Sequence, residues 1–372
     1  MSKKILLISP FLNLISSDFG GKDDVVLKVI DFYLTKSYEV HIFPIKEDLR
    51  ESIKWKFKEN YIHIHASKGF KFSLKTLLNF MANFKFSRTY INSFLSGEFG
   101  NFDNLLKEDF AAIHSLYTRS NYNDFLIEVV PKDTKKISHY HHGKSSNYNM
   151  NDLNIFVSKF EEMKYKDSCN TSVIYNPVEN ISSSKIIDHN EDYFIFLGRI
   201  DKRKRLDLLL EAINEIKEDF KYKLIVIGTE QNKDYSNYCR NYVINKSLNV
   251  DFLGLVSEEY KYSLITSNFC RGMFMPSSEE SFGIAYVECF LKGKKCIGYY
   301  EAIKEFNNIF DYELGIPFKG TEKNPKKLAK CIRDFEENYT ELIPSEVITK
   351  IEKMFSLTSF QDSLNKEINK LI

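Results

Sequence analysis

The stretch PSSEESFGIAYVECF, from Pro276 to Phe290, joins a short strand pattern to an apolar helical pattern. The run GMFMPS before it is typical of a buried strand, and Gly283 marks the break before a helix that begins near Ile284. Glu288 lies inside that apolar helix, where a carboxylate is rarely buried without a partner. We therefore expect a polar group to face Glu288.

The same alternation of short apolar runs and helical patterns extends through most of the chain. Runs that are apolar on both faces and separated by helices are typical of parallel sheets covered on both sides. The predicted strands are KKILLIS, YEVHIF, AAIHSLY, KKISHYH and NIFVS in the first half, and DYFIFLG, YKLIVIG, VDFLG, GMFMPS and KKCIGY in the second. The predicted helices include residues 22–35, 124–130, 206–217, 257–266 and 284–292.

These patterns predict an α/β protein with two doubly wound, Rossmann-like domains that face each other across a cleft. Around Asn176 to Asp192 the chain becomes polar and loses its periodicity, which is typical of a hinge. We expect an N-terminal domain at residues 1–177 and a C-terminal domain at 178–358. A closing helix at 359–372 is expected to pack back on the N-terminal domain. Ligands of such folds bind at the carboxyl ends of the strands.

The bulk composition excludes several classes of protein. The 372 residues include 43% hydrophobic residues, enough for two globular domains, and the net charge of +1 does not favour nucleic acid as a partner. The six cysteines are scattered and are expected to be reduced thiols. The N-terminal apolar run is interrupted by Pro10 and Asn13, so we predict a first strand and not a signal peptide. A cytoplasmic protein, at most peripheral on a membrane, is expected.

The break before Ile284 has the chemistry of a phosphate site. A strand–loop–helix junction directs free backbone N–H groups, here of residues 282–285, towards a ligand, and the helix dipole also favours an anion. Glu288 lies one turn into the helix and leans back towards its N-terminus, so it could accept from ribose hydroxyls beside a phosphate. Glu280, in the loop itself, could address the hydroxyls of a sugar.

A second basic stretch, FLGRIDKRKRLDLLLEA, follows the first strand of the same half. Gly198 and Arg199 end the strand, and Lys204 lies near the start of the next helix. The two cations could neutralise the charge that develops on a departing diphosphate. Taken alone, the run of charges would also fit an ordinary solvated loop.

Together these elements resemble the C-terminal half of the retaining glycosyltransferases of family 4, which have the GT-B fold. The resemblance rests on G-R-x4-K (Gly198, Arg199 and Lys204), a strand that ends in Gly228, FLG, and then P-S-x-x-E-S-F-G-x4-E, and it covers residues 192–298. The N-terminal half matches more loosely. Its Gly20 and Gly21 resemble the family's glycine loop facing the donor diphosphate, although an ordinary turn is also possible.

The resemblance implies a role for each matching residue. Arg199 and Lys204 would bind the diphosphate, Glu280 the transferred sugar and Glu288 the ribose of a nucleotide-sugar, with a UDP-sugar as the favoured donor. A histidine at the end of a strand often lies near the donor sugar in this family, and here it could be either His141 or His142. The complete donor-binding prediction is Gly20, Gly21, Arg199, Lys204, Glu280, Ser281, Phe282, Gly283, Ile284 and Glu288, with Arg199, Lys204, Glu280 and the two histidines as catalytic candidates.

The chain departs from the family pattern in three places. Arg205 stands where the family often has glycine after its lysine. The element that commonly reads G-x-G is Gly228, Thr229 and Glu230, which leaves the contacts to the base open. After the E-x7-E helix, CIGYYEAIKEF replaces a strand and a glycine-rich loop, so the far edge of the donor site is open too.

The implied reaction needs neither metal nor cofactor. No D-x-D sequence occurs, and Arg199, Lys204 and the helix N-terminus could supply the charge of a divalent ion. Retention in the family, together with the lack of a marked carboxylate nucleophile, favours front-face transfer, in which the diphosphate oxygen takes the proton of the acceptor.

The segment Lys54–Arg88 carries eight basic residues and one acid, interleaved with aromatic residues. This pattern fits an anionic membrane surface, and similar chemistry fits single-stranded nucleic acid, but a helical pair with aromatic core residues would show it as well. The resemblance implies that the domain at 1–177 binds the acceptor and the domain at 178–358 binds the donor. Because the segment lies in this acceptor half, we predict a glycan or lipid-linked acceptor at the inner membrane face. A GT-B nucleotide-sugar 2-epimerase and a non-catalytic nucleotide-sugar sensor are the rival interpretations, since fold alone does not decide function.

Overall fold

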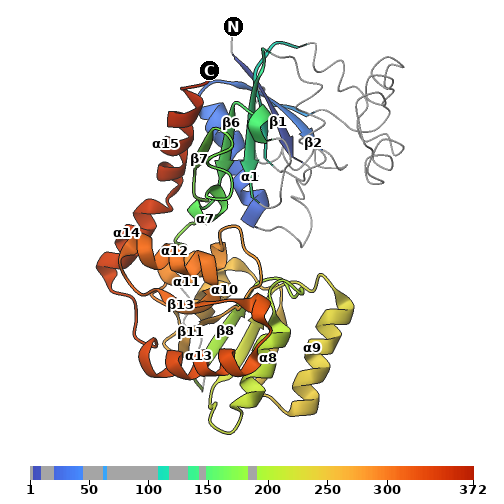
Figure 1. Cartoon of the computed structure of the whole chain (residues 1–372), viewed down its shortest axis with the longest axis vertical. Helices are drawn as coiled ribbons and strands as arrows, with labels where there is room; N and C mark the ends of the chain where they lie inside the picture. The colour runs from blue at the N-terminus through green and yellow to red at the C-terminus, as the bar shows by residue number, and fades with distance from the viewer. Residues whose placement is uncertain are drawn as a thin grey trace. The chain divides into compact units, whose positions relative to one another are not determined.

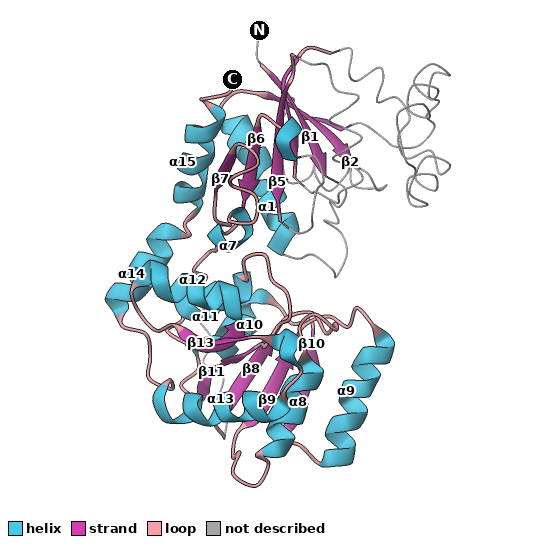
Figure 2. Ribbon diagram, viewed as in Figure 1, coloured by secondary structure: helices cyan, strands magenta, loops and turns pink. Residues whose placement is uncertain are grey.

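The computed structural model describes residues 3–9, 21–44, 62–64, 108–116, 133–141, 148–182 and 191–372 (Figure 1). Gly20, His142, the predicted helix at 124–130 and all of the segment 54–88 except 62–64 lie outside these residues. The chain divides into two compact units, residues 1–175 with 361–372, and residues 176–360. Each unit is built around one parallel sheet (Figure 2).

In the N-terminal unit the described strands form a seven-stranded sheet in the order β3-β2-β1-β4-β5-β6-β7. Every pairing is parallel, and the order reverses between β1 and β4, as in a doubly wound fold. The central β1 is apolar on both faces, with Ile5 to Ile8 buried. The strands are β1 (Lys4–Ser9), β2 (Glu39–Pro44), β3 (Ile62–Ile64), β4 (Phe110–Ser115), β5 (Lys135–Tyr140), β6 (Leu153–Phe156) and β7 (Thr171–Val173).

Helix α1 (Gly21–Thr35) connects β1 to β2, and its buried residues Val25, Val29 and Ile30 lie at helical spacing. The short elements η1 (Tyr148–Met150) and α7 (Lys159–Glu162) flank β6. The last helix, α15 (Leu357–Ile368), ends the chain, and residues 361–372 belong to the N-terminal unit. There Gln361 Nε2 donates to Asp31 Oδ2 of α1 at 3.4 Å.

The C-terminal unit repeats the same plan with a six-stranded parallel sheet in the order β10-β9-β8-β11-β12-β13. Its order reverses between β8 and β11, and all five residues of β8 are buried. The strands are β8 (Tyr193–Leu197), β9 (Lys223–Ile227), β10 (Val250–Gly254), β11 (Cys270–Phe274), β12 (Cys296–Tyr299) and β13 (Gly315–Phe318). The prediction of two doubly wound parallel-sheet domains is confirmed.

Helices cover both faces of this second sheet (Figure 2). On one face Phe335 of α13 packs edge-on against Phe194 of β8 and Phe274 of β11. Elsewhere in the unit Phe306 of α12 contacts Phe290 of α11. The helices are α8 (Leu206–Glu215), α9 (Lys233–Lys246), α10 (Glu258–Thr266), α11 (Ile284–Leu291), α12 (Tyr300–Phe310), η2 (Gly320–Glu322), α13 (Pro325–Asn338) and α14 (Ser345–Met354).

Several elements were not among those predicted from sequence: β3, β7, β13, α7, α9, α12 to α14 and the short η1 and η2. Among them α12 follows β12 directly, with Tyr299 as its N-cap residue. The segment CIGYYEAIKEF is therefore a strand that continues into a helix, where the family pattern has a glycine-rich loop. All six cysteines are free thiols, as expected.

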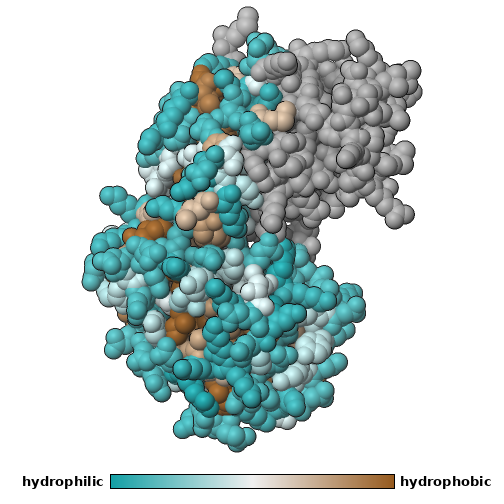
Figure 3. Space-filling view, viewed as in Figure 1, coloured by the Kyte–Doolittle hydropathy of each residue, from teal (hydrophilic) through white to brown (hydrophobic). Residues whose placement is uncertain are grey.

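The visible surface of the C-terminal unit is mostly hydrophilic, with hydrophobic residues in isolated spots (Figure 3). Its exposed large apolar side chains, such as Ile244 on α9 and Leu342 before α14, lie far apart in sequence. Scattered exposed apolar residues are normal for a protein surface. None of the helices in the described ranges is long and apolar enough to cross a membrane.

Candidate functional site

The candidate site of the C-terminal unit lies at the carboxyl ends of β8 and β11, where the strand order reverses. In open parallel sheets the crevice at this reversal is the usual ligand site, because the flanking connections leave to opposite sides. The loop 198–205 follows β8, and the loop 275–283 follows β11. The sheet therefore brings together the two motifs that the sequence analysis selected.

Direct contacts join the two loops. Ser278 donates its backbone N–H to the carbonyl oxygen of Arg203 at 2.7 Å. Lys204 Nζ lies 2.5 Å from Glu280 Oε1, and these two side chains are only 16% and 10% exposed. Ser277 Oγ donates to the same carboxylate oxygen at 2.9 Å. The structure thus pairs two predicted catalytic residues and adds Ser277, which sequence reasoning did not assign.

Asp201 organises the loop after β8. Its Oδ1 accepts the backbone N–H groups of Arg203 and Lys204 at 2.9 and 3.3 Å. Burial alone would raise the pKa of this carboxyl, but Arg203 and Arg199 outweigh the burial and hold the pKa below its ordinary value. Asp201 was not predicted, although an aspartate two and three residues before the N–H groups it accepts is a recognisable turn signal.

Arg199 is more open than Lys204 and Glu280, with 39% of its side chain exposed against 16% and 10%. It donates to Gln231 Oε1 at 3.0 Å and lies 3.7 Å from Asp201 Oδ2. Unlike Lys204 it makes no ion pair with Glu280 among the described contacts. Arg199 is therefore a cation held at the rim of the strand ends, with room to meet an anion.

Arg205 explains one departure from the family pattern. Its backbone is left-handed, with φ of 55°, which is the conformation that glycine adopts without strain. The buried guanidinium offsets this strain through Asp207, at 3.0 Å, and through the carbonyl oxygen of Gly320, at 2.8 Å. The arginine therefore ties the β8–α8 loop to the loop after β13.

We expect Arg205→Ala to lower the free energy of unfolding by about 2–3 kcal/mol, because it loses both contacts and keeps the strained backbone. Arg205→Gly loses the same contacts but relieves the backbone, so it should be more stable than the alanine variant by about 1 kcal/mol. Urea unfolding of the three proteins measures this difference. Equal stability of the two variants would show that the left-handed backbone costs nothing here.

The helix α11 presents the predicted N–H groups. Gly283 is its N-cap residue with φ of 91°, and no side chain caps the helix. A Cβ at Gly283 would overlap the ring of Tyr286, which is buried and bonds through its hydroxyl to the carbonyl oxygen of Met275 at 3.0 Å. Phe282 is buried against Phe306, so only its backbone can serve a ligand. Ile284 begins the helix, as predicted.

The polar partner expected for Glu288 comes from α10. Lys261 Nζ lies 2.8 Å from Glu288 Oε1, and the Tyr262 hydroxyl donates to the same oxygen at 3.1 Å. Burial alone would lower the pKa of Lys261, but Glu288 and Glu258 outweigh it and raise that pKa. Sequence reasoning missed Lys261; its one signal was a lysine inside a predicted helix.

In the N-terminal unit, His141 follows β5 and is buried. Its ring stacks on His139 at 4.3 Å, and His139 stacks on His114 at 5.7 Å. Burial lowers the pKa of His139 to about 3, so its ring is neutral at physiological pH. His114 Nδ1 lies 2.9 Å from the hydroxyl of Tyr33. The roles of His141 and His142 stay predictions, as does that of Gly21, the first residue of α1.

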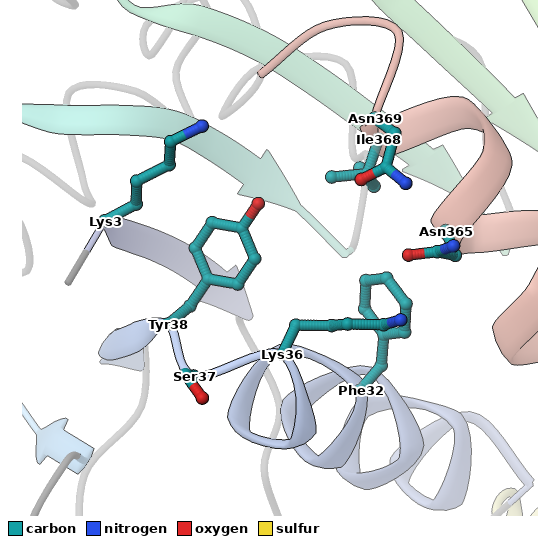
Figure 4. A pocket seen from close by; sticks show the side chains of 8 residues that line it. All are labelled: Lys3, Phe32, Lys36, Ser37, Tyr38, Asn365, Ile368 and Asn369. Atoms are coloured by element: carbon teal, nitrogen blue, oxygen red, sulfur yellow. The ribbon is translucent and has the colours of Figure 1, made fainter.

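A hollow of about 390 Å³ lies elsewhere in the N-terminal unit (Figure 4). Lys3 precedes β1, and Ser37 and Tyr38 precede β2, so this hollow lies at the amino ends of those strands. Ligands of doubly wound sheets bind at the opposite edge. The complete lining is Lys3, Phe32, Lys36, Ser37, Tyr38, Asn365, Ile368 and Asn369.

Comparison with known proteins finds a family match in the C-terminal unit and two curated relatives. Residues 177–350 match the family described as glycosyl transferases group 1. The chain is 26% identical over 261 residues to "Uncharacterized glycosyltransferase MJ1607" of Methanocaldococcus jannaschii, covering 64% of this chain and 58% of that protein. It is 27% identical over 206 residues to "Uncharacterized glycosyltransferase MJ1178" of the same organism, covering 50% and 55%. The chain thus spans a little over half the length of these curated relatives.

Solved structures share the fold over the whole chain. Sucrose-phosphate synthase (tll1590) from Thermosynechococcus elongatus superposes with a TM-score of 0.72 at 15% identity, covering 99% of both chains. Anabaena Alr3699/HepE in complex with UDP-glucose gives 0.71 at 15% identity, covering 99% of this chain and 100% of that one. The protein has the GT-B fold. The match to the family of glycosyl transferases group 1, residues 177–350, falls almost entirely within its C-terminal unit, residues 176–360.

Proposed function

We propose that this protein is a retaining glycosyltransferase of family 4 that moves a sugar from a UDP-sugar to a hydroxyl of a glycan or lipid-linked saccharide. The observation that carries the proposal is the Lys204–Glu280 pair at the strand-order reversal. The uncapped N-terminus of α11 begins four residues after Glu280. A UDP-glucose complex of a neighbour with the same fold supports the class of donor.

In the proposed complex the donor diphosphate meets the N–H groups at the start of α11 together with Arg199 and Lys204. Backbone N–H groups and fixed cations stabilise such an anion without reorganisation. Lys204 would exchange Glu280 for the diphosphate, and Glu280 would accept from hydroxyls of the transferred sugar. Glu288 would accept from a ribose hydroxyl. Ser281, Phe282, Gly283 and Ile284 would contribute their backbone.

The proposed reaction is a front-face transfer. The bond between the anomeric carbon and the diphosphate oxygen breaks, and a bond from the acceptor oxygen to that carbon forms on the same face. The acceptor proton passes to the departing diphosphate oxygen. Negative charge that builds on this leaving group is greatest in the transition state, where Arg199 and Lys204 act most strongly. We propose that no metal takes part, so activity should survive EDTA.

The proposed acceptor follows from composition. The segment Lys54–Arg88 is basic and aromatic, which favours an anionic membrane surface and a lipid-linked acceptor in cell-surface polysaccharide or glycolipid synthesis. We propose a cytoplasmic protein that is peripheral on the inner face of the membrane. Binding to anionic liposomes at low salt, lost when Lys71, Lys75 and Lys85 are reversed in charge, would support this assignment.

The test of the donor is release of nucleoside diphosphate from a panel of UDP-, GDP- and ADP-sugars. We expect slow hydrolysis of a UDP-sugar by the wild type, and a loss of about 100-fold or more in Glu288→Ala. The control is Lys202→Ala, which removes an exposed lysine from the loop after β8 and should leave the rate unchanged.

Two outcomes would contradict the proposal. Conversion of the donor to an epimer without any acceptor would identify a 2-epimerase. Donor binding without turnover, even with membrane extract added as a source of acceptors, would identify a sensor. Release of only GDP or only ADP would support the transferase assignment and would replace UDP by that nucleotide in the proposed donor.

A further inference from the structure

The carboxylate of Glu288 is held by one oxygen only. Lys261 and Tyr262 both contact Oε1, at 2.8 and 3.1 Å. Its other oxygen, Oε2, has no hydrogen-bond partner within the described part of the chain, and it is not among the buried unsatisfied atoms. Oε2 is therefore open to solvent and able to accept a hydrogen bond from a ligand.

The donors that hold Oε1 are themselves fixed. The side chain of Lys261 is 10% exposed, and its ammonium also contacts Glu258 Oε2 at 2.6 Å. Two ammonium groups contact the Tyr262 ring, those of Lys261 at 4.6 Å and Lys292 at 5.2 Å from the ring centroid. Lys292 is in turn anchored to Asn180 Oδ1 at 2.6 Å. A side chain held on this many sides retains little rotational freedom.

Burying the Lys261–Glu288 ion pair costs desolvation free energy that a gain in stability alone does not explain. Burying an ion pair repays its desolvation poorly, so an apolar pair of similar volume would stabilise the fold as well. A preorganised carboxylate, by contrast, avoids an ordering cost when a ligand binds. The ammonium of Lys261 also offsets the charge of Glu288, which would otherwise repel an anionic ligand nearby.

We propose that Lys261 and Tyr262 are positioning residues that hold Oε1 of Glu288 and leave Oε2 to accept a hydroxyl of the donor ribose. The inference rests on the proposed function, because it takes the ribose of a nucleotide as the ligand of Glu288. It adds two residues of α10 to the site, neither of which belongs to the loops at the ends of β8 and β11.

The test measures binding of UDP and of 2′,3′-dideoxy-UDP to the full-length protein by calorimetry. The wild type should bind UDP more tightly, by about tenfold or more, because only UDP can donate to Oε2. In Lys261→Met, which keeps the length of the side chain, that ratio should fall close to one. Tyr262→Phe should reduce the ratio partly, and Lys261→Arg should restore most of it.

The matched control is Glu258→Gln, which removes the charge of the other, more exposed partner of Lys261 but keeps a side-chain oxygen that can accept from its ammonium, and should leave the ratio unchanged. If Lys261 had only a structural role, its loss would weaken the binding of both ligands equally. An unchanged ratio of the two affinities in Lys261→Met would therefore overturn the inference. A wild type that binds both ligands alike would overturn it as well, by removing the ribose contact. No UDP binding at all, with another nucleotide bound or none, would instead refute the proposed donor.

Discussion

For the proposed transfer from a nucleotide-sugar, replacing Lys204 by alanine should lower kcat by a factor of about 10²–10³, with a smaller effect on KM. The reason is the position of its ammonium, which lies 2.5 Å from Glu280 at the reversal of strand order, on a side chain that is only 16% exposed. A cation in such a place acts most strongly on charge that develops as the diphosphate departs. An interaction made mainly in the transition state lowers kcat more than it raises KM.

The control distinguishes the effect of losing Lys204 at the site from the effect of removing one positive charge from the loop. Lys202→Ala removes the same charge from an exposed position two residues earlier and should keep kcat within about twofold of the wild type. Thermal melts of both variants check that the fold survives. A Lys204→Ala enzyme with unchanged kcat and a raised KM would place this lysine in ground-state binding alone.

Gly228→Ala should destabilise the C-terminal unit by about 3–5 kcal/mol. Gly228 follows β9 with φ of 144°, and a Cβ there would overlap the carbonyl oxygen of Gly198 at the end of β8. Backbone atoms in the middle of a sheet cannot move aside as a flexible side chain can. Because Gly198 directly precedes Arg199, we also expect donor binding to weaken.

Gly254→Ala is the matched control. This glycine ends the neighbouring strand β10 and also has a positive φ, 69°, but a Cβ there would meet no atom within 4 Å. Its substitution should therefore cost only the backbone strain, about 1 kcal/mol. Chemical unfolding of both variants gives the comparison. Equal losses would mean that strain, and not the clash with Gly198, governs Gly228.

Much of the fold could be predicted because its strands are buried on both faces. In β8, every residue from Tyr193 to Leu197 is buried, and such an apolar run between helical patterns has few alternative structures. The helix α8 was predicted because its apolar residues recur at helical spacing. By contrast, α13 was missed: it buries only Leu328, Ala329, Ile332 and Phe335 among many charged residues. Its signal lies in the Asn324 cap and Pro325 at the helix start.

The candidate site could likewise be predicted from sequence only in part. The residues Arg199, Lys204 and Glu280 could be selected from sequence because each belongs to a contiguous loop with a recognisable spacing. Their pairing could not be, because Lys204 and Glu280 are 76 residues apart and meet only where β8 and β11 lie side by side.

By itself, the sequence determined the two α/β halves, the helix start at Ile284 and the need for a polar partner at Glu288. Local periodicity and turn chemistry carry that information, since they depend on residues close in the chain. The tertiary structure alone decided which partner it is: Lys261, from a different helix 27 residues earlier. Side chains on separate helices meet according to how those helices pack on a shared sheet, and no spacing along the chain records that packing.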